Sequence, residues 1–361
     1  MGVRESTRGY ETWLARVVPV VRADLDLKHR LMATDAFAFL RATFYRWAQL
    51  WPEVCRDLAE APAVLAVGDL HLENFGTWRD AEGRLIWGVN DFDETVMLPY
   101  TQDLVRLGAS ALLAIEESRL ALTKRRACAA ILDGYAESLR TGGGPAVLAE
   151  RYGWLRDLAI APLKDQRPFW NHLRALPDAP RHAHPQVRRL LITALPLRGP
   201  EVRIVQRQAG LGSLGRVRLV ALANWHGGMI AREAKPLAPS AWLWAQKERP
   251  RPARYREILR CAVRVPDPFL TVEGKWLIRR LAPDGSRIEL ASLPRNRDED
   301  RLLWMMGWET ANMHLGSADK LRPILADLKK RKRNWLSNAA ARMAQAVERD
   351  WRKWRRLTRG G

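Results

Sequence analysis

The sequence predicts an α+β protein built from two lobes. Three observations support this fold class: long segments with apolar residues at helical spacing, short apolar segments separated by turn residues, and their order along the chain, which is helix, sheet, helix, sheet, helix. A chain of 361 residues with 47% hydrophobic composition can bury a core in each lobe. We expect four segments. Residues 1–60 form an N-terminal helical part of the large lobe, and residues 61–200 form a hairpin and further helices of the same lobe. Residues 201–292 form a smaller sheet-rich lobe, and residues 293–361 form a closing helix with a basic tail.

The first lobe begins with helices and then changes to strands. The segment "AFAFLRATFYRWAQLW" has apolar residues at helical spacing and contains no Gly or Pro, so it predicts one continuous helix. "AVLAV" is typical of a short buried strand, and "NFGTW", "RDAEGR" and "LIWGVND" predict a strand, a turn and a second strand. If the turn centres on Ala81 and Glu82, Asn74 lies opposite Val89, and Asp91 follows at the open end of the hairpin.

The remaining elements follow the same two patterns. "LVRLGASALLAIEESRL" and "KRRACAAILDGYAESL" predict helices, "TGGGP" predicts a loop, and residues 155–200 show no pattern that assigns them. Strands are expected over 202–234, then a helix at "ARYREILRCAV", then strands at "FLTVEGKWLIRRL" and "SRIELASL". "RLLWMMGWETANMHL" predicts the helix that closes the body of the protein.

The charge is high and unevenly distributed. The formal net charge is +20, and residues 320–361 contain 14 Lys or Arg against 3 Asp or Glu. Such an excess predicts an anionic partner, such as a nucleotide, a nucleic acid or an anionic lipid. In the tail, apolar residues recur every three or four positions and form one helical stripe: Leu336, Ala340, Met343, Val347, Trp351 and Trp354. We expect the stripe to pack on the body, with nucleic acid or anionic lipid as the alternative partner of the basic tail.

Cysteine content and hydropathy exclude several classes. The three cysteines, Cys55, Cys128 and Cys261, have no spacing typical of a disulfide framework or a zinc site. No apolar segment approaches the roughly 20 residues that a membrane-spanning helix needs. The apolar centre near the N-terminus, "VVPVV", is too short for a signal peptide. We therefore expect a cytoplasmic protein without a transmembrane segment.

The segment "AVGDLHLENFGTW" places Asp69, His71, Glu73 and Asn74 among apolar residues. Buried polar groups cost free energy unless they are paired or used. In the predicted hairpin, Asn74 and Asp91 converge, and Asp69 enters the same end. Carboxylate and amide oxygens suit Mg²⁺, and Asp93 in "NDFDE" supplies a third acid, so we expect Asn74, Asp91 and Asp93 as metal ligands. The alternative is that these residues only cap turns.

"GDLHLEN … VNDFDE … LPYTQDLVRL" resembles the catalytic segment of the aminoglycoside phosphotransferase and choline kinase-like proteins, a branch of the protein-kinase-like fold. The resemblance implies that Asp69 begins the catalytic loop, that Asn74 follows at the spacing typical of the family, and that Asp91 binds metal. The family's later acid corresponds to Asp103, which we interpret as structural. The sequence departs from the family pattern at Val67, where many relatives have His. The absence of an A-P-E segment argues against a eukaryotic-type protein kinase.

A phosphate-binding loop appears after this segment. "GLGSLGRV" matches the kinase pattern G-x-G-x-x-G-x-V with Gly210, Gly212 and Gly215, and Ser213 lies within it. A dinucleotide-binding turn would require a helix next, whereas "RVRLVALANWHGG" alternates like a strand.

The strand "MIAREAKPL" supplies the cation expected to contact phosphate. We choose Lys235, with Arg232 as the alternative because its distance from Gly210 is nearer to the usual kinase spacing. Glu257 or Glu248 is a candidate partner of that cation.

In ordinary kinases the glycine loop precedes the catalytic segment, whereas here Gly210 comes long after Asp69 in the sequence. This order, with "KHRLMATDAFAFLRATFYRW" upstream, resembles domain of unknown function 2252, an uncharacterised bacterial family. The resemblance implies a two-lobed kinase-like fold with its lobes in circularly permuted order, in which the large lobe is mainly helical and the small lobe is an antiparallel sheet.

We expect Mg²⁺·ATP-dependent phosphotransfer to a hydroxyl or amine of a small-molecule acceptor, with Asp69, Asn74 and Asp91 as catalytic residues. The glycine loop and Lys235 would contact the phosphates of ATP. The alternatives are a catalytically degenerate nucleotide-binding protein that uses its basic tail and a metallophosphoesterase, because "GDLH" matches the D-x-H of such sites.

Overall fold

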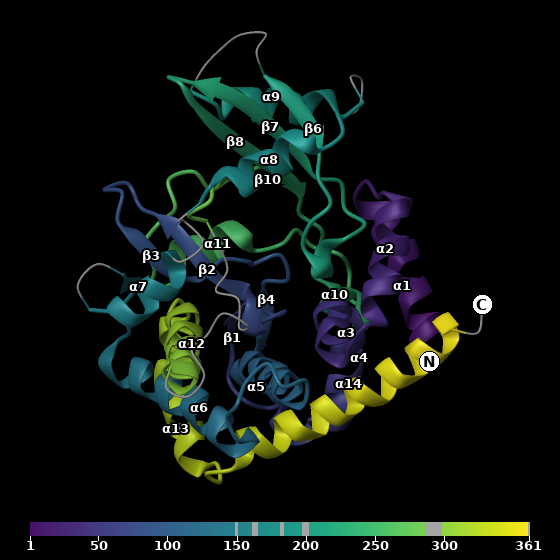
Figure 1. The fold of residues 1–361 in the computed structure, drawn as a ribbon. Coiled ribbons are helices and arrows are strands. Elements are labelled where there is room, and N and C mark those ends of the chain that lie inside the picture. Colours follow the sequence, from purple (N-terminus) through teal and green to yellow (C-terminus); the bar gives the residue numbers. More distant parts are fainter. Residues whose placement is uncertain (149–150, 161–164, 181–183, 197–201, 286–297, 360–361) are drawn as a thin grey trace.

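The computed structural model describes residues 1–148, 151–160, 165–180, 184–196, 202–285 and 298–359. It is a mixed α+β structure in which the strands pair in antiparallel fashion, as the sequence predicts. A five-stranded sheet lies at one end of the molecule and most of the helices lie at the other, with the shorter strands between them (Figure 1).

The N-terminal segment is helical, as predicted, and contains α1 (Val3–Val17), α2 (Arg22–Met32), α3 (Ala36–Ala42), α4 (Phe44–Val54) and the 3₁₀ helix η1 (Arg56–Leu58). The prediction of one continuous helix over "AFAFLRATFYRWAQLW" is wrong, because the chain leaves the helical conformation at Thr43. The Thr43 hydroxyl donates to the carbonyl oxygen of Phe39 at 2.6 Å and so competes with helix continuation. The break ends α3 at the pocket described below, which Arg41 lines.

The predicted strands around residue 80 form two small sheets. β1 (Ala63–Ala66) pairs with β4 (Val96–Pro99), while β2 (Phe75–Arg79) pairs with β3 (Leu85–Val89), which also pairs with β5 (Ala146–Val147). The hairpin register differs from the prediction by one position. Phe75, not Asn74, lies opposite Val89, and the Asn90 N–H donates to the carbonyl oxygen of Asn74 at 3.0 Å. The cause is a turn centred on Glu82, in which the Asp80 side chain accepts the N–H groups of Glu82 and Arg84.

The helical end of the molecule is organised around α5 (Tyr100–Glu116), α6 (Lys124–Thr141) and α12 (Asp298–His314), followed by η6 (Ala318–Lys320) and α13 (Leu321–Lys330). α6 and α12 cross at two glycines. A Cβ on Gly134 would overlap the carbonyl oxygen of Trp304, and a Cβ on Gly307 would overlap that of Ile131. Because neither residue has a side chain, the two backbones come into direct contact.

The basic tail is one long helix, α14 (Trp335–Arg359), which runs along the outside of the helical end and finishes near the N-terminus (Figure 1). Its apolar stripe packs on the body as expected: Leu336, Ala340, Met343, Val347 and Trp354 are buried, and Trp351 packs against the same core. Arg349, Arg352, Lys353 and Arg356 face solvent. Within the described ranges, no helix is both long enough and apolar enough to cross a membrane.

The second sheet contains β6 (Arg203–Gln206), β7 (Leu219–Trp225), β8 (Gly228–Pro236), β9 (Thr271–Glu273) and β10 (Trp276–Leu281) in the order β6-β7-β8-β10-β9. Between β8 and β9 lie α10 (Ala241–Ala245) and α11 (Tyr255–Cys261), the latter as predicted. The strand expected at "SRIELASL" lies outside the described residues.

Residues 155–200, which the sequence left unassigned, contain parts of α7 (Gly153–Ile160) together with α8 (Arg167–Ala175) and α9 (Pro185–Thr193). α8 packs against one face of the five-stranded sheet through Leu173, and α9 packs against the other face through Val187 and Leu191. Both helices therefore belong with the sheet, although the expected boundary at residue 200 assigns them to the large lobe. Their apolar faces are needed to cover the two sides of the sheet.

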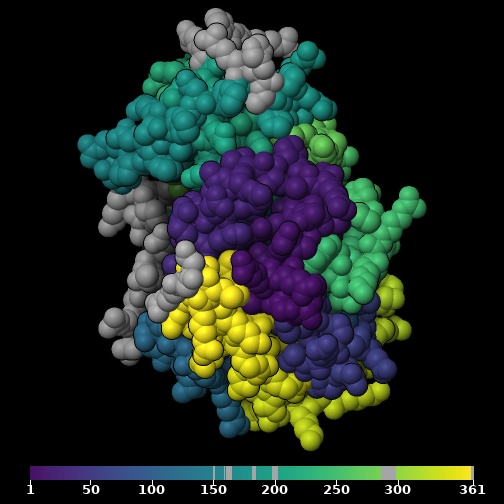
Figure 2. All heavy atoms as spheres, turned by 90° about the vertical axis from the view of Figure 1, so that its right-hand side faces the viewer, coloured from purple at the N-terminus to yellow at the C-terminus, as the bar shows by residue number. Residues whose placement is uncertain are grey.

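The N-terminal segment also holds the sheet in place. Val20 forms an antiparallel bridge with Arg216, and the Val21 N–H donates to the carbonyl oxygen of Gly215 at 2.8 Å. Figure 2 shows this N-terminal part, in purple, between the sheet-containing end above and the C-terminal helix below. Segments from three distant parts of the sequence therefore meet at one place.

Candidate functional site

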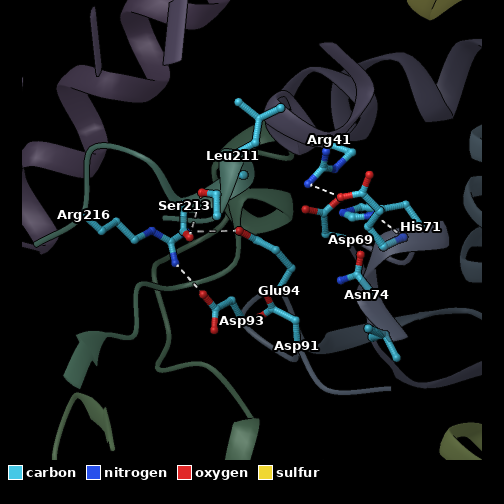
Figure 3. Close-up of a pocket in the computed structure, with 14 residues that line it drawn as sticks. Arg41, Asp69, His71, Asn74, Asp91, Asp93, Glu94, Leu211, Ser213 and Arg216 are labelled. Carbon is cyan, nitrogen blue, oxygen red and sulfur yellow. Dashed lines mark hydrogen bonds and ion pairs between the residues drawn. The ribbon is translucent and has the colours of Figure 1, made fainter. Parts of the chain in front are cut away.

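A pocket lies where the loop after β1, the loop after β3, the end of α3 and the glycine loop come together. It is lined by Asp69, Asn74, Asp91 and Asp93 from the predicted catalytic segment and by residues 210–213 of the glycine loop (Figure 3). Its cavity volume is about 40 Å³. The structure thus brings together two motifs that lie far apart in the sequence.

Asp69 is positioned by α5. The Asp103 carboxylate accepts the N–H groups of Val67 at 2.7 Å and Gly68 at 2.9 Å, so Asp103 anchors this backbone, in line with the structural role expected for it. Gly68 has φ +86°, and a Cβ there would lie 2.5 Å from the carbonyl oxygen of Glu94. Only glycine fits this turn, which directs the following Asp69 into the pocket.

Arg106, one helical turn after Asp103 on α5, holds the Asp69 carboxylate. Its side chain is fully buried; Nε donates to Asp69 Oδ1 at 2.7 Å, and Nη2 donates to the same oxygen and to the carbonyl oxygen of Leu40 at 2.9 Å. Burial raises the pKa of Asp69 to about 6, although the charge of Arg106 opposes this rise. Sequence reasoning missed Arg106, and its position one helical turn after an inward-facing acid was the available signal.

Asn74 and Asp91 lie near Asp69, as expected from the hairpin. Asn74 ends the 3₁₀ helix η2 (Leu72–Asn74) and is 5% exposed. Within the described part of the chain, its buried Oδ1 accepts no hydrogen bond. Asp91 follows β3, and its Oδ1 accepts from Lys235 Nζ at 3.2 Å. Both side chains carry the kind of oxygen that a hard cation prefers, and Asp91 also pairs with Lys235.

The alternation of β8 separates Lys235 from Arg232. The two residues are three positions apart on β8 and so point to opposite faces of the sheet. Lys235 is 2% exposed and contacts Asp91 and, at 2.8 Å, Asp93. Arg232 instead donates to the carbonyl oxygen of Ala194 and lies over the Phe269 ring, away from the site.

Asp93 is engaged by cations. Besides Lys235 it contacts Arg216, whose Nη1 lies 3.1 Å from Asp93 Oδ2. Because both carboxylate oxygens face a cation, these contacts speak against the expected role of Asp93 as a third metal ligand. The neighbouring Glu94 accepts from the Ser240 hydroxyl at 2.9 Å, and burial raises its pKa to about 7. Sequence reasoning missed Glu94 and Arg216.

The glycine loop connects two strands, as the sequence predicts, and folds over Asp69. Gly210 and Gly215 have φ +75° and +98°, a region that favours glycine. A Cβ on Gly212 would lie 3.0 Å from the carbonyl oxygen of Arg41 and 3.5 Å from Asp69 Oδ2. The buried Lys28 donates to the carbonyl oxygen of Gly212 at 3.2 Å, and burial lowers its pKa to about 8.

The other residues singled out in the sequence have supporting contacts. His71 Nδ1 accepts the Glu73 N–H, and the Glu73 carboxylate contacts Arg41 at 2.6 Å. The expected glutamate partners of Lys235 are wrong, because Glu257 binds Arg254 and Glu248 binds Arg251. The acidic partners of Lys235 are Asp91 and Asp93 instead.

The metallophosphoesterase alternative requires a cluster of metal ligands. In the described ranges, no group of three or more His, Cys, Asp or Glu side chains could hold a metal ion. The His172 of "WNHL" lies in α8, which packs on the five-stranded sheet.

Comparison with known protein families gives a match over most of the chain. No curated protein and no solved structure matches the chain. The model of domain of unknown function 2252, described as an uncharacterized protein conserved in bacteria, matches residues 20–158 and 167–357, which include all the pocket residues named above. The chain therefore belongs to the bacterial family of domain of unknown function 2252.

Proposed function

We propose that this protein is a Mg²⁺- and ATP-dependent phosphotransferase with a kinase-like pair of lobes in permuted order. The observation that carries the proposal is the contact between Lys235, on the third strand of the sheet that carries the glycine loop, and Asp91, in the loop after β3. The resemblance to the kinase-like families rests on two motifs: the catalytic segment with Asp69 and Asp91, and the glycine loop with the strands that follow it. The contact between Lys235 and Asp91 lies between these two motifs.

The chemistry fits such a site because phosphoryl transfer requires little covalent work from the protein. Catalysis depends on orientation and on compensation of phosphate charge. In the proposal, backbone N–H groups of the loop Gly210–Gly215 cover the phosphates of ATP, and Lys235 compensates their charge. Asp69 orients the acceptor hydroxyl or amine and takes up its proton.

The surroundings of Asp69 suit a general base. A pKa of about 6 leaves the carboxylate mostly ionised at neutral pH while making it more basic than an exposed aspartate. Both hydrogen bonds from Arg106 go to Oδ1. Oδ2, on the side toward Gly212, is therefore the oxygen that takes up the proton.

Asn74 and Asp91 fit the metal that the proposal requires. Mg²⁺ is usually held by one or two carboxylates together with substrate phosphates, and the unsatisfied Asn74 Oδ1 adds one neutral oxygen. Bound Mg²⁺ would supply positive charge to the phosphate oxygens of the substrate. Asp93 would stay with Lys235 and Arg216 and keep both cations at the site.

The pocket constrains the proposal. A volume of about 40 Å³ is enough for a few water molecules, whereas a ligand of nucleotide size needs about 300 Å³ or more. Binding therefore requires the glycine loop to move away from Asp69. Lys28, which holds Gly212, and Arg218, which donates to Ser213, are the contacts that such a movement would break.

Calorimetric titration of the full chain with ATP, with and without MgCl₂, tests the proposal. We expect the wild type to bind Mg²⁺·ATP and Asp91→Asn to weaken this binding by about tenfold or more, since a ligand charge on the metal is lost. Asp300→Asn is the matched control, because Asp300 has similar exposure and also pairs with a cation, Arg126, on the outside of the helical end. The proposal is refuted if the wild type binds ATP neither with nor without MgCl₂.

A further inference from the structure

The side of the five-stranded sheet that faces the pocket carries a group of charged residues. Directly paired residues of antiparallel strands point to the same side, as do residues two apart on one strand. On β8, Glu233 and Lys235 share the pocket-facing side, and Arg279 on β10 lies directly opposite Glu233. Arg279 therefore joins Lys235 on that side.

Two further arginines extend the group toward the glycine loop. The Arg207 N–H donates to the carbonyl oxygen of Arg218 at 3.0 Å, which continues the pairing of β6 with β7. Arg218 precedes β7 and also donates from Nη2 to the Ser213 hydroxyl in the glycine loop. Four cations thus lie on one side of the sheet next to the loop: Arg207, Arg218, Lys235 and Arg279.

One carboxylate holds the three guanidinium groups together. Glu233 is fully buried, and its oxygens lie 2.7 Å from Arg207 Nη1, 3.0 Å from Arg218 Nη1 and 2.6 Å from Arg279 Nη2. Burial alone would raise the pKa of Glu233, but the three guanidinium charges hold it well below its usual range. Glu233 supplies one negative charge to three guanidinium groups, so these four side chains together carry a net positive charge, and Asp91 also acts on Arg279 and Arg218 from outside the set.

The group also has unused hydrogen-bonding capacity. The buried Nε atoms of Arg207 and Arg218 have no partner in the part of the chain that the structure describes. Buried N–H groups without a partner cost free energy, so a ligand that accepts from them would be favoured. The side chains of Arg207 and Arg279 are 20% and 29% exposed, so a ligand can reach them.

The apolar part of the same side is not available to a ligand. Val205, Val220, Leu222, Ala231 and Leu281 form a cluster with Leu173 of α8, which covers this half of the sheet. A nucleobase normally binds among apolar side chains. What α8 leaves uncovered beside the glycine loop is the charged half.

We infer that Arg207, Arg218 and Arg279, held by Glu233, bind the phosphate chain of the phosphoryl donor, so that the donor is recognised by its phosphates and not by its base. This inference rests on the proposed function and names the donor class, which is a compound with a chain of three or more phosphates. A nucleoside triphosphate and an inorganic polyphosphate share that chemistry. Guanidinium groups suit it because they donate paired hydrogen bonds to phosphate oxygens.

Calorimetric titration of the full chain with ATP, GTP and inorganic tripolyphosphate, each with MgCl₂, tests the inference. We expect the three dissociation constants to agree within about fivefold, because the base adds few contacts. Arg279→Gln weakens all three by about tenfold, the loss expected for a charge-assisted hydrogen bond. Glu233 keeps Arg207 and Arg218 in this variant, so the sheet retains two of its three pairs.

Arg280→Gln is the matched control. Arg280 is the next residue on β10, points to the opposite side and has a similar exposure of 26%. We expect Arg280→Gln to change the three affinities by less than about twofold, because Arg280 pairs with Asp284 on the other side of the sheet and does not contact the ligand. Thermal melting of both variants checks folding, and Arg207→Gln gives an independent variant on a different strand should Arg279→Gln fail to fold.

The outcomes separate the inference from the proposed function. If ATP binds but tripolyphosphate does not, or if Arg279→Gln and Arg207→Gln affect ATP no more than Arg280→Gln does, the inference is wrong and the proposed function remains. If the wild type binds none of the three compounds, both are wrong. Parallel losses for all three compounds in both arginine variants support the inference.

Discussion

Replacement of Arg106 by Met should destabilise the protein in a manner that depends on pH. Arg106 is fully buried, donates to Asp69 and to the carbonyl oxygen of Leu40, and lies over the rings of Phe44 at 5.0 Å and Trp47 at 4.9 Å. Met retains most of the apolar contact but no charge and no donor. The penalty therefore has one part from lost contacts and one part from the charge left on Asp69.

The first part does not depend on pH. An unsatisfied buried carbonyl and the lost cation–π contacts cost about 2 kcal/mol together. The second part depends on Asp69, whose pKa burial raises to about 6 even with Arg106 present. Without the guanidinium charge this pKa rises further, so the folded variant retains a proton that the folded wild type has lost. The penalty then grows above pH 6 by about 1.4 kcal/mol per pH unit until the new pKa is reached.

Urea unfolding followed by tryptophan fluorescence at pH 5 and pH 8 measures both parts. At pH 5 Asp69 is mostly protonated in both proteins, so we expect a loss of about 2 kcal/mol, which rises to about 3–5 kcal/mol at pH 8. In an Asp69→Asn background, the pH-dependent part should disappear. Arg126→Met is the control, because Arg126 is 61% exposed in its pair with Asp300, and it should cost about 1 kcal/mol or less. An equal penalty for Arg106→Met at both pH values would refute the reasoning.

Two further predictions concern stability. Burial raises the pKa of Glu309 to about 8, so the free energy of unfolding should fall as the pH rises from the pKa of the unfolded state to about 8. Glu309→Gln can keep the hydrogen bond from Asn312 and should remove this dependence on pH. A series of thermal melts from pH 5 to pH 9 measures it. An unchanged slope would show that Glu309 is ionised in the folded protein. Gly134→Ala should lower the free energy of unfolding in urea by about 1–3 kcal/mol, because the added Cβ overlaps the carbonyl oxygen of Trp304. A loss no larger than that of an exposed helical substitution would contradict the direct contact of α6 with α12.

The mixed fold and most elements could be predicted from the sequence because apolar periodicity and turn residues are local signals. The helices of the N-terminal segment, the hairpin and the strands on either side of the glycine loop all follow such patterns. The errors arose where a local interaction competed with the pattern. Thr43 interrupts an apolar helix through its hydroxyl, and Asp80 shifts the hairpin register by one position.

The sequence by itself identified Asp69, Asn74, Asp91, Lys235 and the glycine loop as candidates, because residue types at fixed spacing are visible without a fold. Only the tertiary structure decided how they meet. It placed Lys235, and not Arg232, beside the pocket through the alternation of β8, gave Lys235 two aspartates in place of a glutamate, and paired Asp93 with two cations. The physical reason is that such pairings depend on the side of a strand and on contacts between distant segments.

Arg106, Glu94 and Arg216 are buried residues of the site that could not be identified from the sequence. Each is a charged residue within an ordinary helix or loop sequence, and nothing local distinguishes it from a solvent-exposed charge. Their burial beside Asp69 and Asp93 arises only when α5, the loop after β3 and the glycine loop pack together. Candidate residues could thus be named from the sequence, whereas the ion pairs that surround them were decided by the packing of segments far apart in the chain.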